Sequence, residues 1–290
     1  MIRIRGKDML FIEAHGHVWQ KINGRRFDTK KVIPIGNGRV QIGEEEIQFL
    51  PPEMTDCSCR IEVMQTYEKL FGFDKVVLLQ TPCYGEQYEY INDIIANNPD
   101  RYATVGIPNP QDKASYLETA ELCLGQYQYK GLKFEAPDIP FDMLALENQF
   151  VFEEIMKYNA YFMMDLGWGD GPHDFPIEDM LEVAKRYPDM KIILPHMGVS
   201  RLWDPKEKGN LDSLKKTLSI LEYNENVYFD CSGIPMLATH AGEEYPWPLM
   251  TDVLREAKQQ GAIDRVMWGT DMPTVLVACT YKQHIDCVVN

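Results

Sequence analysis

The sequence lacks several features that would indicate other classes of protein. Its 290 residues contain no run approaching the roughly 20 apolar residues of a membrane-spanning helix, and residues 1–10 are too polar for a secretory signal peptide. Positive charge is scarce, because 29 Lys and Arg face 44 Asp and Glu and leave a net charge of −15. Such a chain repels phosphates and anionic lipids, so we expect a cytoplasmic protein that binds neither nucleic acid nor membrane.

The cysteines form no recognisable framework. Their number, seven, is odd, and they are scattered through a chain long enough to build its own core. Cys57 and Cys59 form a C-x-C pair, but no second pair follows at zinc-ribbon spacing, so we expect buried thiols. The sequence also has no short-period repeat or low-complexity tract, and residues 1–290 are predicted to form a single domain.

Short apolar runs alternate with longer amphipathic segments along the chain. The predicted strands are Leu10 to Val18, Lys75 to Gln80, Tyr102 to Ile107, Gly131 to Glu135, Tyr161 to Leu166, Lys191 to His196, Val227 to Cys231 and Arg265 to Gly269. The predicted helices are Arg60 to Phe71, Glu86 to Asn97, Lys113 to Leu124, Asn148 to Tyr158, Ile177 to Tyr187, Leu211 to Glu222 and Pro248 to Gln260. Eight β/α units in a chain of this length predict an α/β fold, the (β/α)8 TIM barrel, with its active site at the carboxyl ends of the strands.

Two segments depart from this alternation. Residues 20–59 form an insertion after the first strand, in which Val32 to Ile42 alternate around Asn37-Gly38, a β-hairpin signal. We expect this insertion to cover the mouth of the barrel. After Asp271 the chain has room for a helix at Thr280 to Val289 and little more, so the C-terminal helix is expected to be short or truncated.

The first strand carries two histidines. Because side chains alternate along a strand, Glu13, His15 and His17 are predicted to face the interior of the barrel, while Ala14 packs on the helices. Gly16 leaves room for close approach. Two neutral imidazoles at one strand end suit a divalent cation, although a hydrogen-bonded histidine pair in a polar core is the alternative.

Further polar residues end the later strands. His196 follows the sixth strand and Asp271 the eighth, where an aspartate can also cap a turn. Asp165 follows four apolar residues of the fifth strand, so it needs either a cation or another buried partner. Lys133, in the fourth strand, can bind an anionic substrate or pair with Glu135 or Glu13. The sequence leaves these alternatives open.

Taken together, these segments resemble the amidohydrolase-2 family of the amidohydrolase superfamily, from Phe11 to about Val288. The resemblance is carried by His15-x-His17, Leu79-Gln80-Thr81-Pro82-x-Tyr84-Gly85, Pro99-Asp100-Arg101-Tyr102, Gly131-Leu132-Lys133, His196-Met197-Gly198 and Asp264-Arg265-Val266-Met267-Trp268-Gly269-Thr270-Asp271-Met272-Pro273. It implies a TIM barrel with a divalent metal, commonly zinc or manganese, bound by His15, His17 and Asp271. It also implies that His196 is a catalytic acid, base or polarising group.

The sequence departs from the family pattern at Asp165, where many members carry a metal-binding histidine. If Asp165 were a fourth ligand, two carboxylates and two neutral imidazoles would cancel the charge of a divalent ion and favour manganese over zinc. His173 could replace it as a ligand, although an exposed loop histidine is the simpler interpretation. The early end of the chain is a second departure from the family.

Two reactions fit such a site. A metal-dependent hydrolase would use a metal-activated water on a lactone, amide or ester, with Asp271 accepting the proton and His196 steadying the oxyanion. A non-oxidative decarboxylase of the aminocarboxymuconate-semialdehyde or resorcylate type would bind the substrate carboxylate and protonate carbon through His196 or Asp271. We expect the hydrolase; a metal-free barrel that only binds a ligand is a further alternative.

The substrate is expected to be a small cyclic or aromatic molecule that bears a carboxylate. Lys133 and Arg201 are the candidate cations, with solvation the alternative for Arg201. Four tryptophans fall in loops after predicted strands, and Trp19 and Trp168 are predicted to contact the substrate. The family resemblance makes a homodimer plausible, although nothing in the spacing of residues requires one.

Overall fold

The computed structural model describes residues 2–4, 7–26, 30–167, 173, 175–199 and 211–289. Among these residues, eight parallel strands follow one another in two sheets. They are β3 (Ile12–His17), β8 (Lys75–Leu79), β9 (Tyr102–Thr104), β10 (Gly131–Glu135), β11 (Tyr161–Asp165), β12 (Lys191–Leu194), β13 (Val227–Asp230) and β14 (Val266–Met267).

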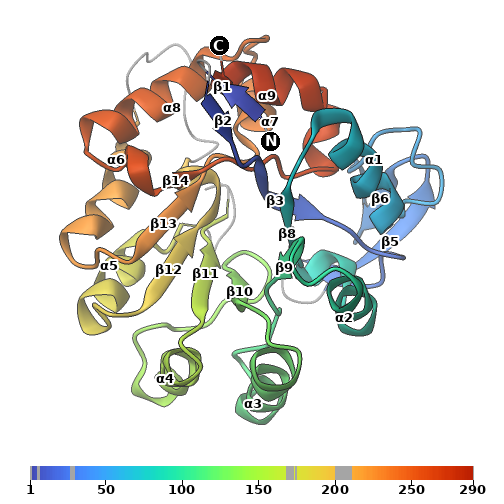
Figure 1. Cartoon of the computed structure of the whole chain (residues 1–290). Coiled ribbons are helices and arrows are strands. Elements are labelled where there is room, and N and C mark those ends of the chain that lie inside the picture. Colours follow the sequence, from blue (N-terminus) through green and yellow to red (C-terminus); the bar gives the residue numbers. More distant parts are fainter. Residues whose placement is uncertain are drawn as a thin grey trace.

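Backbone hydrogen bonds close the two sheets into a ring. Between β9 and β10, Gly106 N donates to Gly131 O at 2.9 Å. Between the segments of β14 and β3, Ala14 N donates to Trp268 O at 3.1 Å. The predicted (β/α)8 barrel is therefore confirmed, and the carboxyl ends of all eight strands lie at one end of it (Figure 1).

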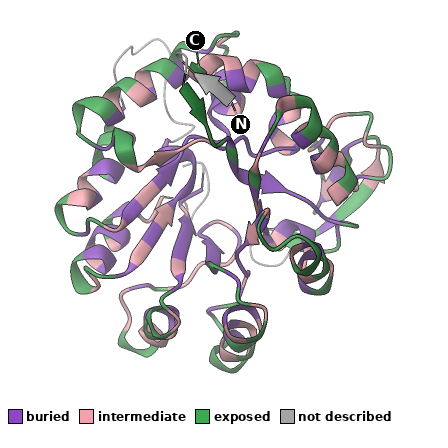
Figure 2. Cartoon of the chain, viewed as in Figure 1, coloured by how far each residue is buried: buried purple, intermediate pink, exposed green. Residues whose placement is uncertain are grey.

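Helices surround the barrel (Figure 1). They are α1 (Ile61–Phe71), α2 (Tyr88–Asn97), α3 (Lys113–Ala120), α4 (Phe150–Lys157), α5 (Ile177–Arg186), α6 (Asp212–Leu218), α7 (Ile234–His240), α8 (Pro248–Gln259) and α9 (Tyr281–Val289). Figure 2 shows largely buried strands and helices exposed on their outer sides. The sequence did not predict α7, and the helix predicted at Lys113 to Leu124 continues beyond α3 as a π-helical segment, Glu121–Gln126.

The insertion after β3 contains an antiparallel sheet. Its strands are β4 (Arg25–Arg26), β5 (Lys30–Gly36), β6 (Arg39–Ile42) and β7 (Glu45–Gln48). The predicted hairpin is present, since β5 and β6 are joined at Asn37 and Gly38, which both have the positive φ that a type I′ turn requires. Ile47, Gln48 and Phe49 line the cavity at the carboxyl ends of the strands, so the insertion contributes a wall of that cavity.

Strand β3 breaks the alternation that the sequence predicts. Its register with β8 shifts between Glu13 and Gly16, as at a β-bulge. Ala14, predicted to pack on the helices, instead lines the hollow inside the barrel. A Cβ added to Gly16 would lie 2.5 Å from Met64 Cε of α1, so Gly16 faces the helices. The bulge leaves His15 and His17 together at the strand end and turns Glu13 away from them.

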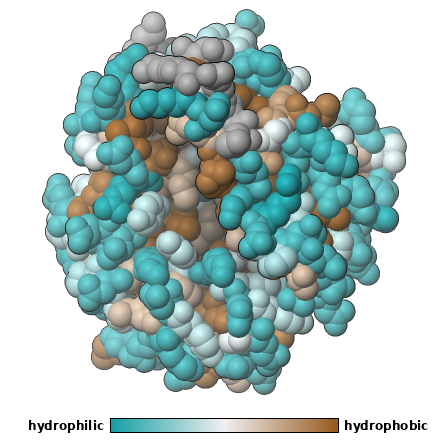
Figure 3. Space-filling model, viewed as in Figure 1, coloured by the Kyte–Doolittle hydropathy of each residue, from teal (hydrophilic) through white to brown (hydrophobic). Residues whose placement is uncertain are grey.

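The other end of the barrel is apolar and hollow. A cavity of about 350 Å³ is lined by strand residues such as Val77, Val105 and Met163, and a second of about 370 Å³ lies between β2 (Lys7–Met9), β14 and α9. Figure 3 shows apolar side chains gathered around a hollow near the centre of this face. The short strand β2 pairs with β1 (Ile2–Ile4). Among the described residues, no helix has the length and apolar character needed to cross a membrane.

Candidate metal centre

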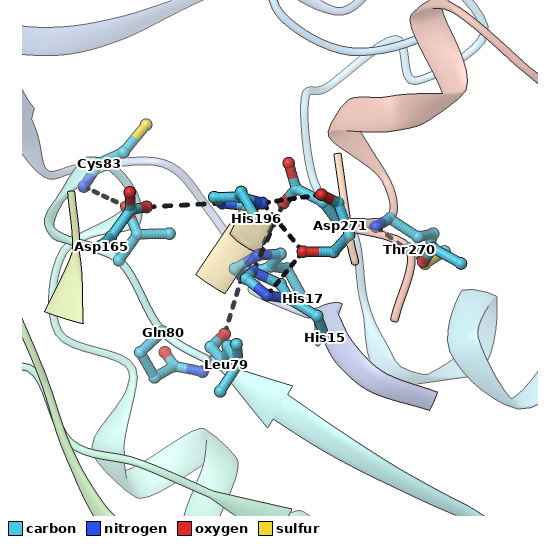
Figure 4. A network of polar contacts seen from close by, with 12 residues as sticks. His15, His17, Leu79, Gln80, Cys83, Asp165, His196, Thr270 and Asp271 are labelled. Carbon is cyan, nitrogen blue, oxygen red and sulfur yellow. Dashed lines mark hydrogen bonds and ion pairs between the residues drawn. The ribbon is translucent and has the colours of Figure 1, made fainter. Parts of the chain in front are cut away.

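Three predicted ligands meet at the carboxyl ends of β3 and β14. Ligand atoms of His15, His17 and Asp271 all lie within 4.8 Å of one another, and all three residues are buried. Asp271 Oδ1 is 3.0 Å from His17 Nε2 and 3.8 Å from His15 Nε2. Asp271 N donates to His15 O at 2.8 Å, which fixes the two chain segments against each other. Figure 4 shows the two imidazoles and the carboxylate directed toward one common point.

The hydrogen bonds of His17 determine which of its nitrogens can bind a cation. His17 Nδ1 lies 3.0 Å from Leu79 O, and because a carbonyl oxygen only accepts, Nδ1 must carry the proton. Burial is the main reason that the pKa of His17 falls to about 4, so the ring is neutral at pH 7. Nε2 therefore presents a lone pair to an Asp271 oxygen only 3.0 Å away. Two electron-rich atoms at this distance fit a shared cation.

His15 is oriented in the same manner by a buried carboxylate. His15 Nδ1 lies 2.9 Å from Asp230 Oδ2 and 3.0 Å from Ser232 Oγ. His15 Nε2 is buried and has no hydrogen-bond partner among the described residues. Carboxylate contacts of this type fix the tautomer of metal-binding histidines. The residues present therefore fit a divalent metal at His15, His17 and Asp271. His15, His196 and Asp230 form a second group with ligand atoms within the same range.

His196 stands beside this centre in a constrained turn after β12. Its φ of 56° lies in the left-handed region, and its backbone N–H donates to Asp230 Oδ1 at 3.2 Å. Its Nδ1 lies 3.0 Å from the carbonyl oxygen of Ser232, so Nδ1 carries a proton and Nε2 is the nitrogen that exchanges one. Asp271 also has a positive φ, 69°. Both predicted catalytic residues therefore have unusual backbone conformations.

Asp165 lies on the far side of His196 from the three-residue group. Its Oδ2 is 3.6 Å from His196 Nε2 and 3.9 Å from Lys133 Nζ, and among the described residues it belongs to neither potential metal group. Burial lowers the pKa of His196, but contact with Asp165 outweighs that effect and raises it to about 9. Burial likewise opposes the charge on Asp165, whose pKa nevertheless falls well below its usual range because of His196 and Lys133.

Lys133 is buried and engaged by acidic neighbours. Its Nζ lies 2.6 Å from Glu135 Oε1, which identifies Glu135, not Glu13, as its internal partner. Burial disfavours the charge on Lys133, but Glu135 and Asp165 raise its pKa above the usual value. Burial also raises the pKa of Glu135 to about 8, against the opposing effect of Lys133. Lys133 lines the cavity, yet its ammonium group already contacts the carboxylates of Glu135 and Asp165.

A cavity of about 250 Å³ opens over the candidate metal ligands. Besides the residues above, Arg26, Thr81, Tyr84, Met236, His240 and Thr274 line it. Arg26 comes from the insertion; its side chain is 21% exposed and its Nε lies 3.3 Å from Asp138 Oδ1. The Tyr84 ring lies 5.5 Å from the His17 ring. The cavity thus combines an aromatic wall, a guanidinium group and the metal centre.

Of the remaining residues considered from the sequence, Trp19 and His173 do not line this cavity. Trp19 is 0% exposed, stacks on Tyr84 with ring centroids 3.9 Å apart and donates through Nε1 to Cys57 O, so it supports the cavity wall instead of contacting a substrate. His173 lines a different hollow, with Met143 and Asp179, and belongs to neither potential metal group of the described residues. Trp168 and Arg201 lie outside the described residues.

Three residues of the site were not predicted from the sequence: Asp230, Ser232 and Arg26. Asp230 ends the predicted seventh strand, so the rule that identified Asp165 and Asp271 could have found it, with Ser232 two residues beyond. Arg26 gave no such signal, because its position depends on how the insertion packs over the barrel.

Comparisons with known proteins agree with this architecture. A family model described as amidohydrolase matches residues 12–288. None of the curated proteins matches the chain. Among solved structures, a probable 2-pyrone-4,6-dicarboxylic acid hydrolase from Acinetobacter baumannii is 16% identical, with a TM-score of 0.66 over 97% of this chain and 91% of the other. A zinc-bound amidohydrolase from Burkholderia multivorans is 15% identical, with a TM-score of 0.56 over 97% and 90% of the chains. The 2,6-dihydroxybenzoate decarboxylase from Rhizobium is 14% identical, with a TM-score of 0.56 over 96% of both.

Proposed function

The chain belongs to the amidohydrolase family, and on that premise we propose that it is a metal-dependent hydrolase of small cyclic or aromatic substrates that bear a carboxylate. The bond to be broken is that of a lactone, amide or ester. The observation that carries the proposal is the convergence of His15, His17 and Asp271, with the Nε2 lone pairs of both imidazoles directed at one point.

Zinc is the cation that we propose for this site. His15 and His17 would bind it through Nε2, and Asp271 through its carboxylate. Two imidazoles and one carboxylate from the protein, with a position left open, are typical of catalytic zinc. A fourth ligand from Asp165 was the reason to favour manganese, but Asp165 contacts His196 and Lys133. A bound divalent cation would lower the pKa of water and polarise a substrate carbonyl group.

His196 and Asp271 would move the protons of the reaction. Asp271 Oδ1 lies beside both metal-binding imidazoles, where it can accept a proton from an attacking water. His196 Nε2 faces the same cavity, and contact with Asp165 favours the protonated form of that nitrogen. A protonated Nε2 can steady a developing oxyanion and donate its proton to the leaving group.

Arg26 is the residue that we propose to bind the substrate carboxylate. Both Lys133 and Arg26 line the cavity, but the Lys133 side chain is only 2% exposed, whereas that of Arg26 is 21% exposed. A guanidinium carries five N–H donors, so it can hold Asp138 and a substrate carboxylate at the same time. The ring of Tyr84 would pack on a flat substrate. The Acinetobacter neighbour is described as a probable hydrolase of a cyclic dicarboxylate, which is the same class of molecule.

Decarboxylation is the second candidate reaction. A protonated His196 Nε2 directed into the cavity suits the protonation of a carbon atom that loses carbon dioxide, and one structural neighbour is a decarboxylase of a hydroxybenzoate. The zinc-loaded protein should be incubated with a panel of lactones and hydroxybenzoates, with ring opening and carbon dioxide release followed separately. Hydrolysis predicts ring opening without carbon dioxide. If neither product forms and the protein stays folded, the remaining interpretation is a barrel that binds a ligand without converting it.

A further inference from the structure

Glu13 is a buried carboxylate that the proposed chemistry does not use. It precedes His15 by two residues, and the bulge in β3 turns it away from the cavity. It is 0% exposed, so its charge needs partners within the protein. Those partners lie on β3, on the loop that carries Asp271, and on the C-terminal helix α9.

The Glu13 carboxylate accepts four hydrogen bonds. Oε1 accepts from the backbone N–H of His15 and of Thr270, each at 2.9 Å. Oε2 accepts from the hydroxyl of Thr270 at 2.8 Å and from the hydroxyl of Tyr281. A carboxylate offers about four acceptor positions, and here every one is used. Burial raises the pKa of Glu13, and these hydrogen bonds oppose that shift.

The two backbone donors belong to residues at or next to the proposed metal ligands. One belongs to His15 itself, and the other belongs to Thr270, which immediately precedes Asp271. The same Thr270 hydroxyl accepts from Met272 N at 3.0 Å, on the other side of Asp271. Glu13 thus connects the backbone segments of two proposed metal ligands that come from opposite ends of the sequence.

Tyr281 donates a hydrogen bond to the Glu13 carboxylate from helix α9. It is the first residue of α9, and aromatic rings enclose it, with centroids 4.8 Å away at Tyr67 and 5.3 Å away at Phe71 and Phe73. Its ring therefore has little freedom to move, and its hydroxyl is delivered to Glu13 by α9 packing on the barrel.

We propose that Glu13 and Tyr281 are positioning residues that set the distance between the metal ligands His15 and Asp271. This inference rests on the proposed metal site, and it makes the C-terminal helix α9 part of the metal-binding structure. The hydrogen bonds act on backbone groups, so their loss should change the separation of the ligands without removing a ligand. Residues that orient metal ligands contribute about 10- to 100-fold in affinity.

The test measures metal affinity, not activity. Glu13→Ala removes all four acceptor contacts, Glu13→Gln keeps the volume and one carbonyl oxygen, and Tyr281→Phe removes one hydroxyl. The controls are Glu68→Ala, which removes a buried carboxylate bound to Arg101, and Tyr116→Phe, which removes a buried hydroxyl bound to Val151 O. Each folded full-length variant is stripped with chelator and titrated with Zn²⁺ against a competing chelator, and the visible spectrum of its Co²⁺ form is recorded.

We expect Glu13→Ala to bind Zn²⁺ about 100-fold more weakly and Tyr281→Phe about 10-fold more weakly, with Glu13→Gln between wild type and Glu13→Ala. Their Co²⁺ spectra should differ from that of wild type, whereas both controls should match wild type. Equal Zn²⁺ affinity in wild type, Glu13→Gln and Tyr281→Phe would overturn the inference even if Glu13→Ala did not fold. Wild-type protein that binds no divalent metal would overturn the proposed function as well, so the two failures are distinguishable.

Discussion

His17 Nε2 lies 3.0 Å from Asp271 Oδ1, although His17 ends the first strand of the barrel and Asp271 follows the last. Closure of the ring produces this proximity, because His17 N donates to Met272 O across the β3 and β14 segments at 2.9 Å. The lone pair of a neutral imidazole and a carboxylate oxygen repel each other at that distance unless a proton or a metal ion lies between them. The convergence of these two proposed metal ligands is therefore a consequence of barrel closure.

The first prediction concerns metal content. His17→Ala and Asp271→Asn each remove one proposed ligand, so each should lower the zinc content from about one ion per chain to near zero after dialysis against a weak chelator. Elemental analysis by mass spectrometry gives the ratio. His240→Ala is the control, since His240 lines the same cavity outside the metal groups of the described residues and its variant should keep the wild-type metal content. Unchanged zinc in both ligand variants would contradict the assignment.

Much of this arrangement could be predicted from the sequence. The alternation of short, mostly apolar segments with longer amphipathic segments identified all eight strands. Polar residues at strand ends identified His15, His17, His196 and Asp271, since a barrel brings all its carboxyl ends to one face.

What the sequence could not predict depends on contacts between distant segments. Alternation alone places Glu13 beside the histidines, and the register shift in β3 reverses that placement. An acid at the end of β11 fits a metal or a salt bridge equally well, and only the positions of His196 and Lys133 show which contacts Asp165 makes. Trp19 is aromatic and close to the site in sequence, but its side chain packs behind Tyr84.

The second prediction separates metal binding from turnover. In His196→Asn, the side-chain amide can replace the hydrogen bond of Nδ1 to Ser232 O but cannot replace Nε2. Zinc content and unfolding temperature should stay close to wild type, while kcat on a substrate found in the panel should fall by about 10²- to 10⁴-fold, the usual contribution of a general acid or base. A variant with wild-type kcat would show that His196 has another role.

The third prediction concerns the pKa of His196 in the metal-free protein. Asp165→Asn removes the largest contribution that raises this pKa. Burial, which lowers it, remains, as do Asp271 and Asp230, which raise it, so the value should fall well below about 9. Nitrogen-15 NMR titration of the imidazole measures it, with the resonance assigned by its absence in His196→Asn. A value near 9 in both proteins would mean that Asp165 does not stabilise the imidazolium.

The same pair gives a pH dependence of stability with a definite sign. Because folding raises the pKa of His196, the pair stabilises the metal-free protein fully below about pH 6.5 and loses this contribution as the pH rises through about 9. The difference in unfolding free energy between wild type and Asp165→Asn should therefore shrink across that interval. Urea unfolding at several pH values measures it, and a difference that grows toward pH 9 would contradict the pairing.

The fourth prediction concerns the carboxylate behind His15. Asp230→Asn keeps the shape of the side chain but removes the charge that holds the Nδ1 proton of His15, so zinc affinity should fall by about 10- to 100-fold with all three ligands present. Isothermal titration of the metal-free protein measures this loss. Affinity equal to wild type would mean that Asp230 supports only the backbone of His196 and Ser232.

The fifth prediction concerns substrate recognition by the insertion. Arg26→Met should raise KM for a carboxylate-bearing substrate at least about 10-fold and leave KM for its neutral ester nearly unchanged, because only the carboxylate needs the guanidinium. Arg39→Met is the matched control, since Arg39 lies in the same insertion but forms an exposed pair with Glu46. Parallel increases in KM for both substrates would indicate a general disturbance of the insertion.

The most direct test of the metal centre is an anomalous-difference map from crystals of the zinc-loaded protein, recorded on both sides of the zinc edge. We predict one peak about 2.0 to 2.2 Å from Nε2 of His15, from Nε2 of His17 and from a carboxylate oxygen of Asp271. A map with no peak between these three residues, or with its peak at other side chains, would contradict the account.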